Sequence, residues 1–98
     1  MWQIKLHPLV LREDLKSIDP HEQKIILKAI HKKLSHDPEA YGKALGGGFA
    51  GYWRLRVEDY RVIYRIVKDE VVVLAVKVGI RKDDRIYQEF FARLRKLE

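Results

Sequence analysis

Apolar residues in the N-terminal part of the chain follow two periodicities. Every second side chain is apolar from Trp2 to His7, which predicts a strand that enters the core. Apolar positions then recur at helical spacing over Leu9–Ile18, and again over Pro20–Ser35, where an Asp-Pro pair can begin a helix. The inward-facing positions are expected to be Leu11, Leu15 and Ile18 in the first helix, and Ile26 or Leu27, Ile30 and Leu34 in the second. A strand followed by a two-helix hairpin is therefore predicted.

Alternation at every second residue returns in the C-terminal half. Asp37-Pro38 ends the second helix, and Glu39 to Ala50 is expected to be a glycine-containing loop. Three strands are expected at Tyr52–Val57, Tyr60–Val67 and Glu70–Val78, followed by a helix over Arg85–Leu97 with Ile86, Phe90 and Leu94 on its apolar stripe. The order predicts an α+β fold, in which an antiparallel sheet of the first strand and a three-stranded meander has helices packed on one face and ends in a C-terminal helix.

Length and composition narrow the class of protein. With 98 residues, we expect one domain over residues 1–98. Cysteine is absent, which suits a reducing cytosol, and neither a signal peptide nor an apolar run of about 20 residues is present. A cytoplasmic protein without a membrane partner is therefore expected. The net charge of +6 favours polyanionic partners, either nucleic acid or an acidic protein.

Several kinds of catalytic chemistry lack their residues. The four histidines are scattered without a metal-ligand spacing, so we expect no metal and read them as surface residues. Ser17 and Ser35 are the two serines, there is no threonine, and no Gly-x-Ser-x-Gly motif occurs, which argues against a serine triad. The glycines at 46–48 do not form a Walker loop. No cofactor is expected.

What remains is a cluster of basic and aromatic side chains on the predicted sheet and the segment after it. Its members are Tyr52, Arg54, Arg56, Tyr60, Arg61, Tyr64, Arg65, Lys77, Arg81, Lys82, Arg85 and Tyr87. Arginine grips phosphate with a planar fork of donors, and aromatic rings can stack on unpaired bases. The cluster is typical of an RNA-binding surface, although a solvated basic sheet face with packed tyrosines would give the same pattern.

The same residues resemble the signature of RelE-like toxins in the RelE/ParE superfamily. The most specific pieces are Trp53-Arg54-Leu55-Arg56 with Asp59-Tyr60-Arg61, and Gly79-x-Arg81 with Tyr87 six positions on. The upstream part is also similar, with a Trp-containing first strand, two helices and a Gly-Lys-x-Leu-Gly segment at Gly42 to Gly46. The similarity spans essentially the whole chain.

The resemblance implies a toxin that cuts messenger RNA in the ribosomal decoding site without a metal, using the RNA's own 2′-hydroxyl as nucleophile. By position, Arg61 resembles the family's transition-state arginine, Arg81 the arginine that assists the leaving group, and Tyr87 the tyrosine that orients a base. Arg54 stands where a second basic residue of the catalytic set is expected. The substrate-binding residues are then expected to be Tyr52, Arg56, Lys82 and Arg85.

Two positions depart from the RelE pattern. RelE-type toxins carry lysines where this chain has Tyr52 and Arg54, and many relatives carry His in place of Ile80. Because arginine keeps its proton, the general base stays open between Tyr52, Tyr87 and electrostatic activation without a discrete base.

The resemblance also implies partners and alternatives. The expected partners are a cognate acidic antitoxin, in a hetero-oligomeric complex, and the ribosome with its messenger RNA. The same scaffold hosts ParE-like inhibitors of DNA gyrase that are not nucleases. A catalytically inactive domain that binds nucleic acid or an antitoxin is a third possibility.

Overall fold

A mixed β-sheet forms the centre of the molecule. The computed structural model describes residues 1–80 and 85–97. Within them the strands are β1 (Gln3–Leu6), β2 (Lys43–Ala44), β3 (Trp53–Val57), β4 (Tyr60–Val67) and β5 (Val72–Ile80). They form one five-stranded sheet in the order β1-β5-β4-β3-β2. The predicted α+β class is confirmed.

The meander of β3, β4 and β5 is antiparallel, as predicted, and β4 has the predicted bounds. The two-residue turn between β3 and β4 places Glu58 at a φ of 51°, the left-handed backbone that the turn requires. The first strand differs from the expected antiparallel arrangement, because β1 pairs with β5 in parallel. A parallel neighbour needs a long crossover connection, and the helical segments with β2 to β4 supply it.

The helical hairpin after β1 is less regular than predicted. Instead of one helix over Leu9–Ile18, the chain forms a π-helical turn, η1 (Val10–Asp14), and a 3₁₀ turn, η2 (Leu15–Ser17). The changed period buries Val10 and leaves Leu11 51% exposed, so the expected inward position of Leu11 is wrong. The second helix is α1 (Pro20–Ala29), continued by the π-helical turn η3 (Ile30–Leu34). Asp19 caps α1, its Oδ2 accepting from the His21 amide at 3.2 Å.

The predicted loop from Glu39 to Ala50 contains short elements of its own. Asp37 Oδ1 accepts a hydrogen bond of 3.1 Å from the Ala40 amide and caps the single-turn helix α2 (Pro38–Tyr41). The strand β2 follows and pairs with β3, and a 3₁₀ turn, η4 (Gly47–Phe49), precedes β3. Part of the segment that the sequence predicted to be a loop is therefore regular. Asp37 caps α2, and β2 pairs with the edge of the sheet at β3.

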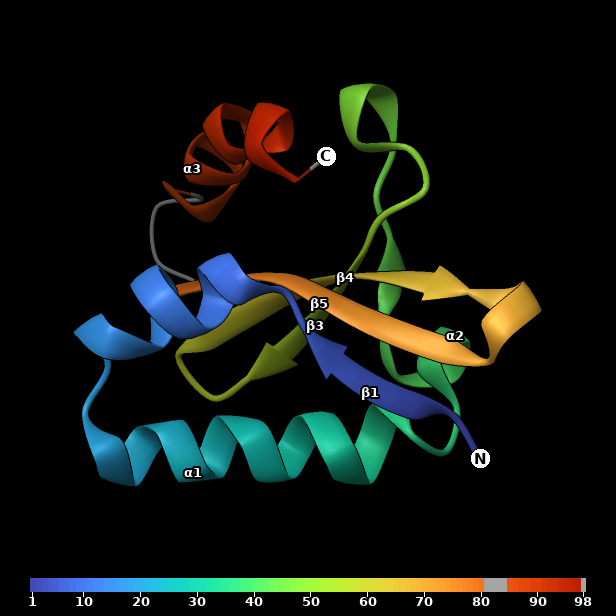
Figure 1. The fold of residues 1–98 in the computed structure, drawn as a ribbon, viewed down its shortest axis with the longest axis horizontal. Helices are drawn as coiled ribbons and strands as arrows, with labels where there is room; N and C mark the ends of the chain where they lie inside the picture. The colour runs from blue at the N-terminus through green and yellow to red at the C-terminus, as the bar shows by residue number, and fades with distance from the viewer. Residues whose placement is uncertain (81–84, 98) are drawn as a thin grey trace.

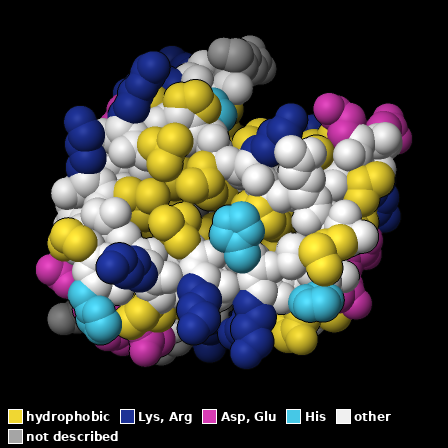
Figure 2. All heavy atoms as spheres, turned by 60° about the horizontal axis from the view of Figure 1, so that its bottom comes forward, with side chains coloured by type: hydrophobic (Ala, Val, Ile, Leu, Met, Phe, Trp, Pro, Cys, Tyr) yellow, Lys and Arg dark blue, Asp and Glu magenta, His cyan; other side chains and the backbone are white. Residues whose placement is uncertain are grey.

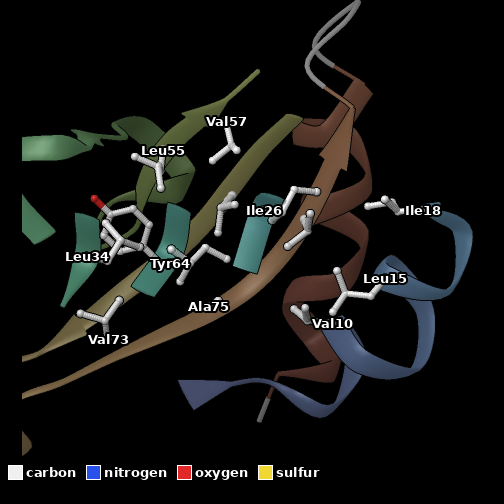
Figure 3. Packing of buried hydrophobic residues seen from close by; sticks show 13 residues of the cluster. Val10, Leu15, Ile18, Ile26, Leu34, Leu55, Val57, Tyr64, Val73 and Ala75 are labelled. Atoms are coloured by element: carbon white, nitrogen blue, oxygen red, sulfur yellow. The ribbon is translucent and has the colours of Figure 1, made fainter. Parts of the chain in front are cut away.

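The larger core cluster lies between the sheet and the helical segments η1, η2, α1 and η3 (Figure 3). Its buried residues are Val10, Leu15, Ile18, Ile26, Ile30, Leu34, Leu55, Val57, Val62, Tyr64, Val73, Ala75 and Val78. They include the predicted stripe of Ile26, Ile30 and Leu34. Tyr64 is fully buried there, and its hydroxyl donates to the Pro38 carbonyl at 2.5 Å. The hydroxyl passes so close to Gly42 that a Cβ at this position would lie 1.7 Å from it.

The opposite face of the sheet carries the C-terminal helix. α3 (Arg85–Arg93), followed by the 3₁₀ turn η7 (Leu94–Lys96), places Ile86 and Phe90 against Ile63 and Val76. Figure 1 shows α1 below the sheet and α3 above it. Helices therefore cover both faces, rather than one. In the described part of the chain, no helix has the length and apolar character to span a membrane.

Candidate functional site

Three of the four predicted catalytic side chains meet on the face of the sheet that carries α3. Nη1 of Arg54, on β3, donates a hydrogen bond of 3.2 Å to the Tyr87 hydroxyl on α3. The guanidinium carbon of Arg61, on β4, lies 5.3 Å from the centre of the Tyr87 ring. Two guanidinium groups and a phenol, contributed by three separate elements, therefore share one site.

The register of the sheet explains why the arginines lie together. Arg61 is paired with Arg56 on β3 and with Gly79 on β5. Arg54 lies two residues before Arg56, so both project from the same face of β3. On β4, Ile63 lies two residues after Arg61 and therefore projects from the same face, where it packs beneath α3. The alternation thus brings Arg54, Arg56 and Arg61 to the face beneath α3.

Gly79 lets α3 approach this face. A Cβ at position 79 would lie 3.1 Å from Cγ1 of Ile86, which is tighter than an ordinary contact. Ile86 is fully buried and immediately precedes Tyr87. The close packing at Gly79 therefore sets how near Tyr87 comes to the arginines.

Arg61 is held more firmly than a surface arginine. Its side chain is buried, with a residue exposure of 7%, and its guanidinium lies within cation–π distance of Tyr87. Arg54 is half-buried, whereas Arg56 is exposed. Burial limits the conformations of Arg61 and leaves its planar fork of donors in a defined position.

Tyr52 also lies on this face but has packing partners of its own. Its ring meets Phe90 edge-on with 4.9 Å between centroids, and the guanidinium of Arg65 lies 5.9 Å from its centre. Phe49 contacts the rings of Tyr87 and Phe90 at 6.2 and 5.6 Å. These aromatic side chains join the candidate site to the smaller core cluster.

The remaining predicted site residues are placed differently. Arg85 is exposed at the first position of α3 and lines a hollow of about 530 Å³ between η1, the end of β5 and α3. That lining contains neither Arg54, Arg61 nor Tyr87. Arg81 and Lys82 lie outside the described residues.

Two members of the wider basic and aromatic cluster are structural. Tyr64 belongs to the core on the α1 side, where burial, and then the charges of Asp37 and Glu39, raise the pKa of its phenol. Lys77 is buried, and its ammonium lies 3.0 Å from Oδ1 of Asp14. Neither side chain presents an open surface to RNA, so this part of the predicted cluster is wrong.

Asp14 and Arg93 are the important residues that the sequence did not reveal. The Asp14 carboxylate accepts two hydrogen bonds from Arg93, at 2.6 and 2.7 Å, and one of 2.8 Å from the Val78 amide of β5. Burial opposes the charge of Arg93, but hydrogen bonds and the charge of Asp14 outweigh it and raise the pKa of the guanidinium. This ion pair ties α3 and η1 to the sheet, and α3 carries Tyr87.

Metal ligands are not grouped in the described part of the chain. Residues 1–80 and 85–97 contain no cluster of three or more His, Asp or Glu side chains that could hold a metal ion.

Comparisons with known proteins identify the family. Residues 4–85 match the family model described as ParE toxin of type II toxin–antitoxin system, parDE. Toxin RelG of Mycobacterium tuberculosis is 31% identical over 72 residues, which cover 74% of this chain and 83% of RelG.

Solved structures agree in fold. The M. tuberculosis toxin–antitoxin complex RelBE2 contains a chain that matches with a TM-score of 0.77 and 26% identity, covering 82% of this chain and 98% of that one. Free Escherichia coli RelE, in a mutant form, matches with a TM-score of 0.68 and 20% identity over 95% of this chain and 97% of its own. By the family model and the RelG similarity, the chain belongs to the RelE/ParE superfamily and is a toxin of a type II toxin–antitoxin system.

Proposed function

We propose that this toxin is an endoribonuclease that cleaves messenger RNA in the decoding site of the ribosome. The observation that carries the proposal is the convergence of Arg54, Arg61 and Tyr87 on one face of the sheet. Guanidinium groups supply fixed positive charge and paired donors, which suit a phosphodiester whose negative charge grows during reaction.

The proposed reaction uses the RNA itself as nucleophile. The 2′-oxygen of a ribose attacks the adjacent phosphorus, a P–O2′ bond forms, and the P–O5′ bond breaks. The products are a 2′,3′-cyclic phosphate and a 5′-hydroxyl. One proton leaves the 2′-hydroxyl and one reaches the departing O5′, so that atoms and charge balance.

Each described side chain has a role in this scheme. Arg61, buried and fixed, stabilises the charge on the non-bridging phosphate oxygens. Because Tyr87 accepts a hydrogen bond from Arg54, its own O–H proton is directed elsewhere and can be donated to a phosphate or leaving oxygen. The assignment of Arg81 to the leaving group is carried by the family resemblance.

Substrate contacts extend the site along the sheet. Tyr52, which precedes β3, and Arg56 on β3 flank Arg54, one offering an aromatic ring and the other an exposed guanidinium. We assign both to RNA binding, together with Lys82 and Arg85. Because Tyr87 acts as a proton donor in this scheme, Tyr52 is the tyrosine that stays a candidate for the general base.

A cognate acidic antitoxin is the proposed protein partner. The structures of RelBE2 and of Pyrococcus horikoshii RelE–RelB are toxin–antitoxin complexes, which supports such a partner here. Figure 2 shows hydrophobic side chains gathered on the side of the molecule that carries α1, with lysines and arginines along the lower margin. An amphipathic acidic segment that folds on binding would match both features.

Inhibition of DNA gyrase is the second candidate function, favoured by the match of residues 4–85 to the ParE family model. The two functions are separated by one paired experiment. Purified toxin is incubated with ribosomes programmed with a defined message, and in parallel with gyrase and supercoiled DNA. The proposal expects new RNA ends and no trapped gyrase–DNA complex, whereas intact message with cleaved DNA would replace it with the second candidate.

A further inference from the structure

A basic hollow lies beside the candidate site, at the β2 edge of the sheet. It has a volume of about 480 Å³. Its lining consists of Lys33, Tyr41, Gly42, Lys43, Arg54, Leu55 and Arg56, which come from η3, α2, β2 and β3 and the residue that joins α2 to β2. Arg54 belongs to both places, since it also contacts Tyr87.

The short length of β2 creates this hollow. Lys43 is paired with Arg54 and Ala44 with Trp53, so β3 continues past β2 at Leu55 and Arg56. The residues that line the hollow at this step in the sheet edge include four basic ones, Lys33, Lys43, Arg54 and Arg56.

The hollow is suited to an anion. Four of its described lining residues are cationic, and that lining includes no Asp or Glu. Glu39, two residues before Tyr41, lies 3.3 Å from Lys68 in an ion pair. A concave site with one sign of charge concentrates ligands of the opposite charge.

We propose that this hollow binds the phosphate backbone of the RNA strand next to the reacting phosphate. The inference rests on the proposed ribonuclease function and adds a second contact region to it. Arg54 joins the hollow to Tyr87, and Arg56 follows on the same strand. A single strand held at Arg61 can therefore continue over β3 to Lys33 and Lys43 without leaving basic surface.

The lining favours RNA over an acidic protein segment. A segment that folds on binding gains its affinity by burying apolar side chains, but Leu55 in this hollow is only 2% exposed. Tyr41, in contrast, is 54% exposed and can stack on an unpaired base. Phosphate contacts with an adjacent stacking ring are the usual combination in single-strand binding.

The test uses a 2′-O-methylated single-stranded RNA oligonucleotide, which cannot undergo 2′-attack. Fluorescence anisotropy measures its affinity for the toxin at several salt concentrations. The variant K33Q/K43Q removes two cations from the hollow, and K24Q/K28Q removes two cations from α1 as a charge-matched control. We expect K33Q/K43Q to bind about 5- to 30-fold more weakly than the control. The slope of log affinity against log salt should become shallower by about 0.7 for each phosphate that the variant no longer neutralises.

A second pair of variants tests the stacking contact. Tyr41→Ala should weaken binding by about fivefold or more, while Tyr41→Phe should bind like the parent. Thermal unfolding of every variant confirms that the fold is intact.

Two results would overturn the inference. Equal RNA affinities and salt slopes for K33Q/K43Q and K24Q/K28Q would show that only net charge matters. Weakened binding of the cognate antitoxin by K33Q/K43Q, with RNA affinity matching the control, would make the hollow a protein contact. Because the oligonucleotide is uncleavable, either result leaves cleavage on the ribosome as a separate question, and absent cleavage would leave the binding result standing.

Discussion

The hydroxyl oxygen of Tyr87 accepts a hydrogen bond of 3.2 Å from Nη1 of Arg54, across 33 positions of sequence. This contact joins α3 to β3 directly above the sheet. The same ring lies 5.3 Å from the guanidinium carbon of Arg61. The geometry of the candidate site therefore depends on how α3 is docked, and α3 is docked by the buried pair of Arg93 and Asp14.

Replacing Tyr87 with Phe separates the ring from the hydroxyl. Tyr87→Phe keeps an aromatic face beside Arg61 but loses the proton and the acceptor for Arg54. We expect the single-turnover cleavage rate on ribosomes to fall by about 10²- to 10⁴-fold, with little change in RNA affinity. Tyr87→Ala, which also removes the ring, should reduce both. Wild-type cleavage by Tyr87→Phe would remove the hydroxyl from the mechanism.

Asp14→Ala tests the anchor of α3. The substitution removes the buried carboxylate that Arg93 and Lys77 share, and leaves each buried cation only a partly exposed partner, Glu13 for Arg93 and Glu89 for Lys77. Breaking one partner of a buried pair costs about 3–5 kcal/mol of the free energy of unfolding. Glu13→Gln is the control, because Glu13 also pairs with Arg93, at 3.2 Å, but its side chain is 52% exposed. It should cost less than about 1 kcal/mol in the same denaturant titration. Equal stabilities of the two variants would contradict the role of Asp14.

Gly42 and Gly48 form a matched pair for a steric prediction. Gly42→Ala places a methyl group 1.7 Å from the buried Tyr64 hydroxyl, so the side chain or the backbone must move. Overpacking of this kind costs about 1–3 kcal/mol. At Gly48 a Cβ has no atom within 4 Å, and Gly48→Ala should change stability by less than about 0.5 kcal/mol. Calorimetric unfolding of both variants measures the difference in stability. Equal stabilities would show that Tyr64 can move away from the new methyl group without a cost in free energy.

Tyr60 gives the fold a pH dependence in the alkaline range. Its hydroxyl donates to Oε2 of Glu22, and this hydrogen bond, with desolvation and nearby carboxylates, raises the pKa of Tyr60 from 10.0 to about 12. The folded state thus favours the neutral phenol more than the unfolded state does. Its stabilisation is complete below pH 10 and is lost as pH rises from 10 to 12.

Phenolate absorbance provides the measurement for Tyr60. In a spectrophotometric titration, Tyr60→Phe should remove a tyrosine that ionises near pH 12. Glu22→Gln should instead bring that ionisation down toward its ordinary range, because the charged acceptor is gone. An unchanged titration curve in Glu22→Gln would show that the two side chains are not coupled.

The strands and the arginine cluster could be predicted because their signals are local. Alternation over Tyr52–Val57 and Tyr60–Val67 gives both the strand and the face that each residue occupies. The shared face of Arg54 and Arg56 could therefore be predicted, whereas Arg61 was grouped with Tyr60 and Tyr64, which belong to the core cluster on the other face. The pattern of residues 85–97 predicts a helix but does not place Tyr87 beside the arginines. That placement was implied by the family resemblance.

The docking of α3 could not be predicted, because its signals are not local. Central strands buried on both faces read as continuous apolar runs, and such runs do not say which face receives a given helix. Asp14 and Arg93 are 79 positions apart and look like ordinary surface charges in the sequence. Likewise, the π-helical turn at Val10–Asp14 changes the helical period. The prediction that Leu11 faces the core assumed the α-helical period and was therefore wrong.

The most direct test of the proposed mechanism is the single-turnover cleavage of a defined message on programmed ribosomes by wild-type toxin, Arg61→Ala and Arg61→Lys. We predict that the wild type leaves a 2′,3′-cyclic phosphate at the cut. Arg61→Ala should be slower by about 10²- to 10³-fold, and Arg61→Lys should recover only part of the rate, because it restores charge but not the paired donors. Cleavage by Arg61→Ala at the wild-type rate, or an uncut message with the wild type, would contradict the proposal that these arginines and Tyr87 act on a phosphodiester.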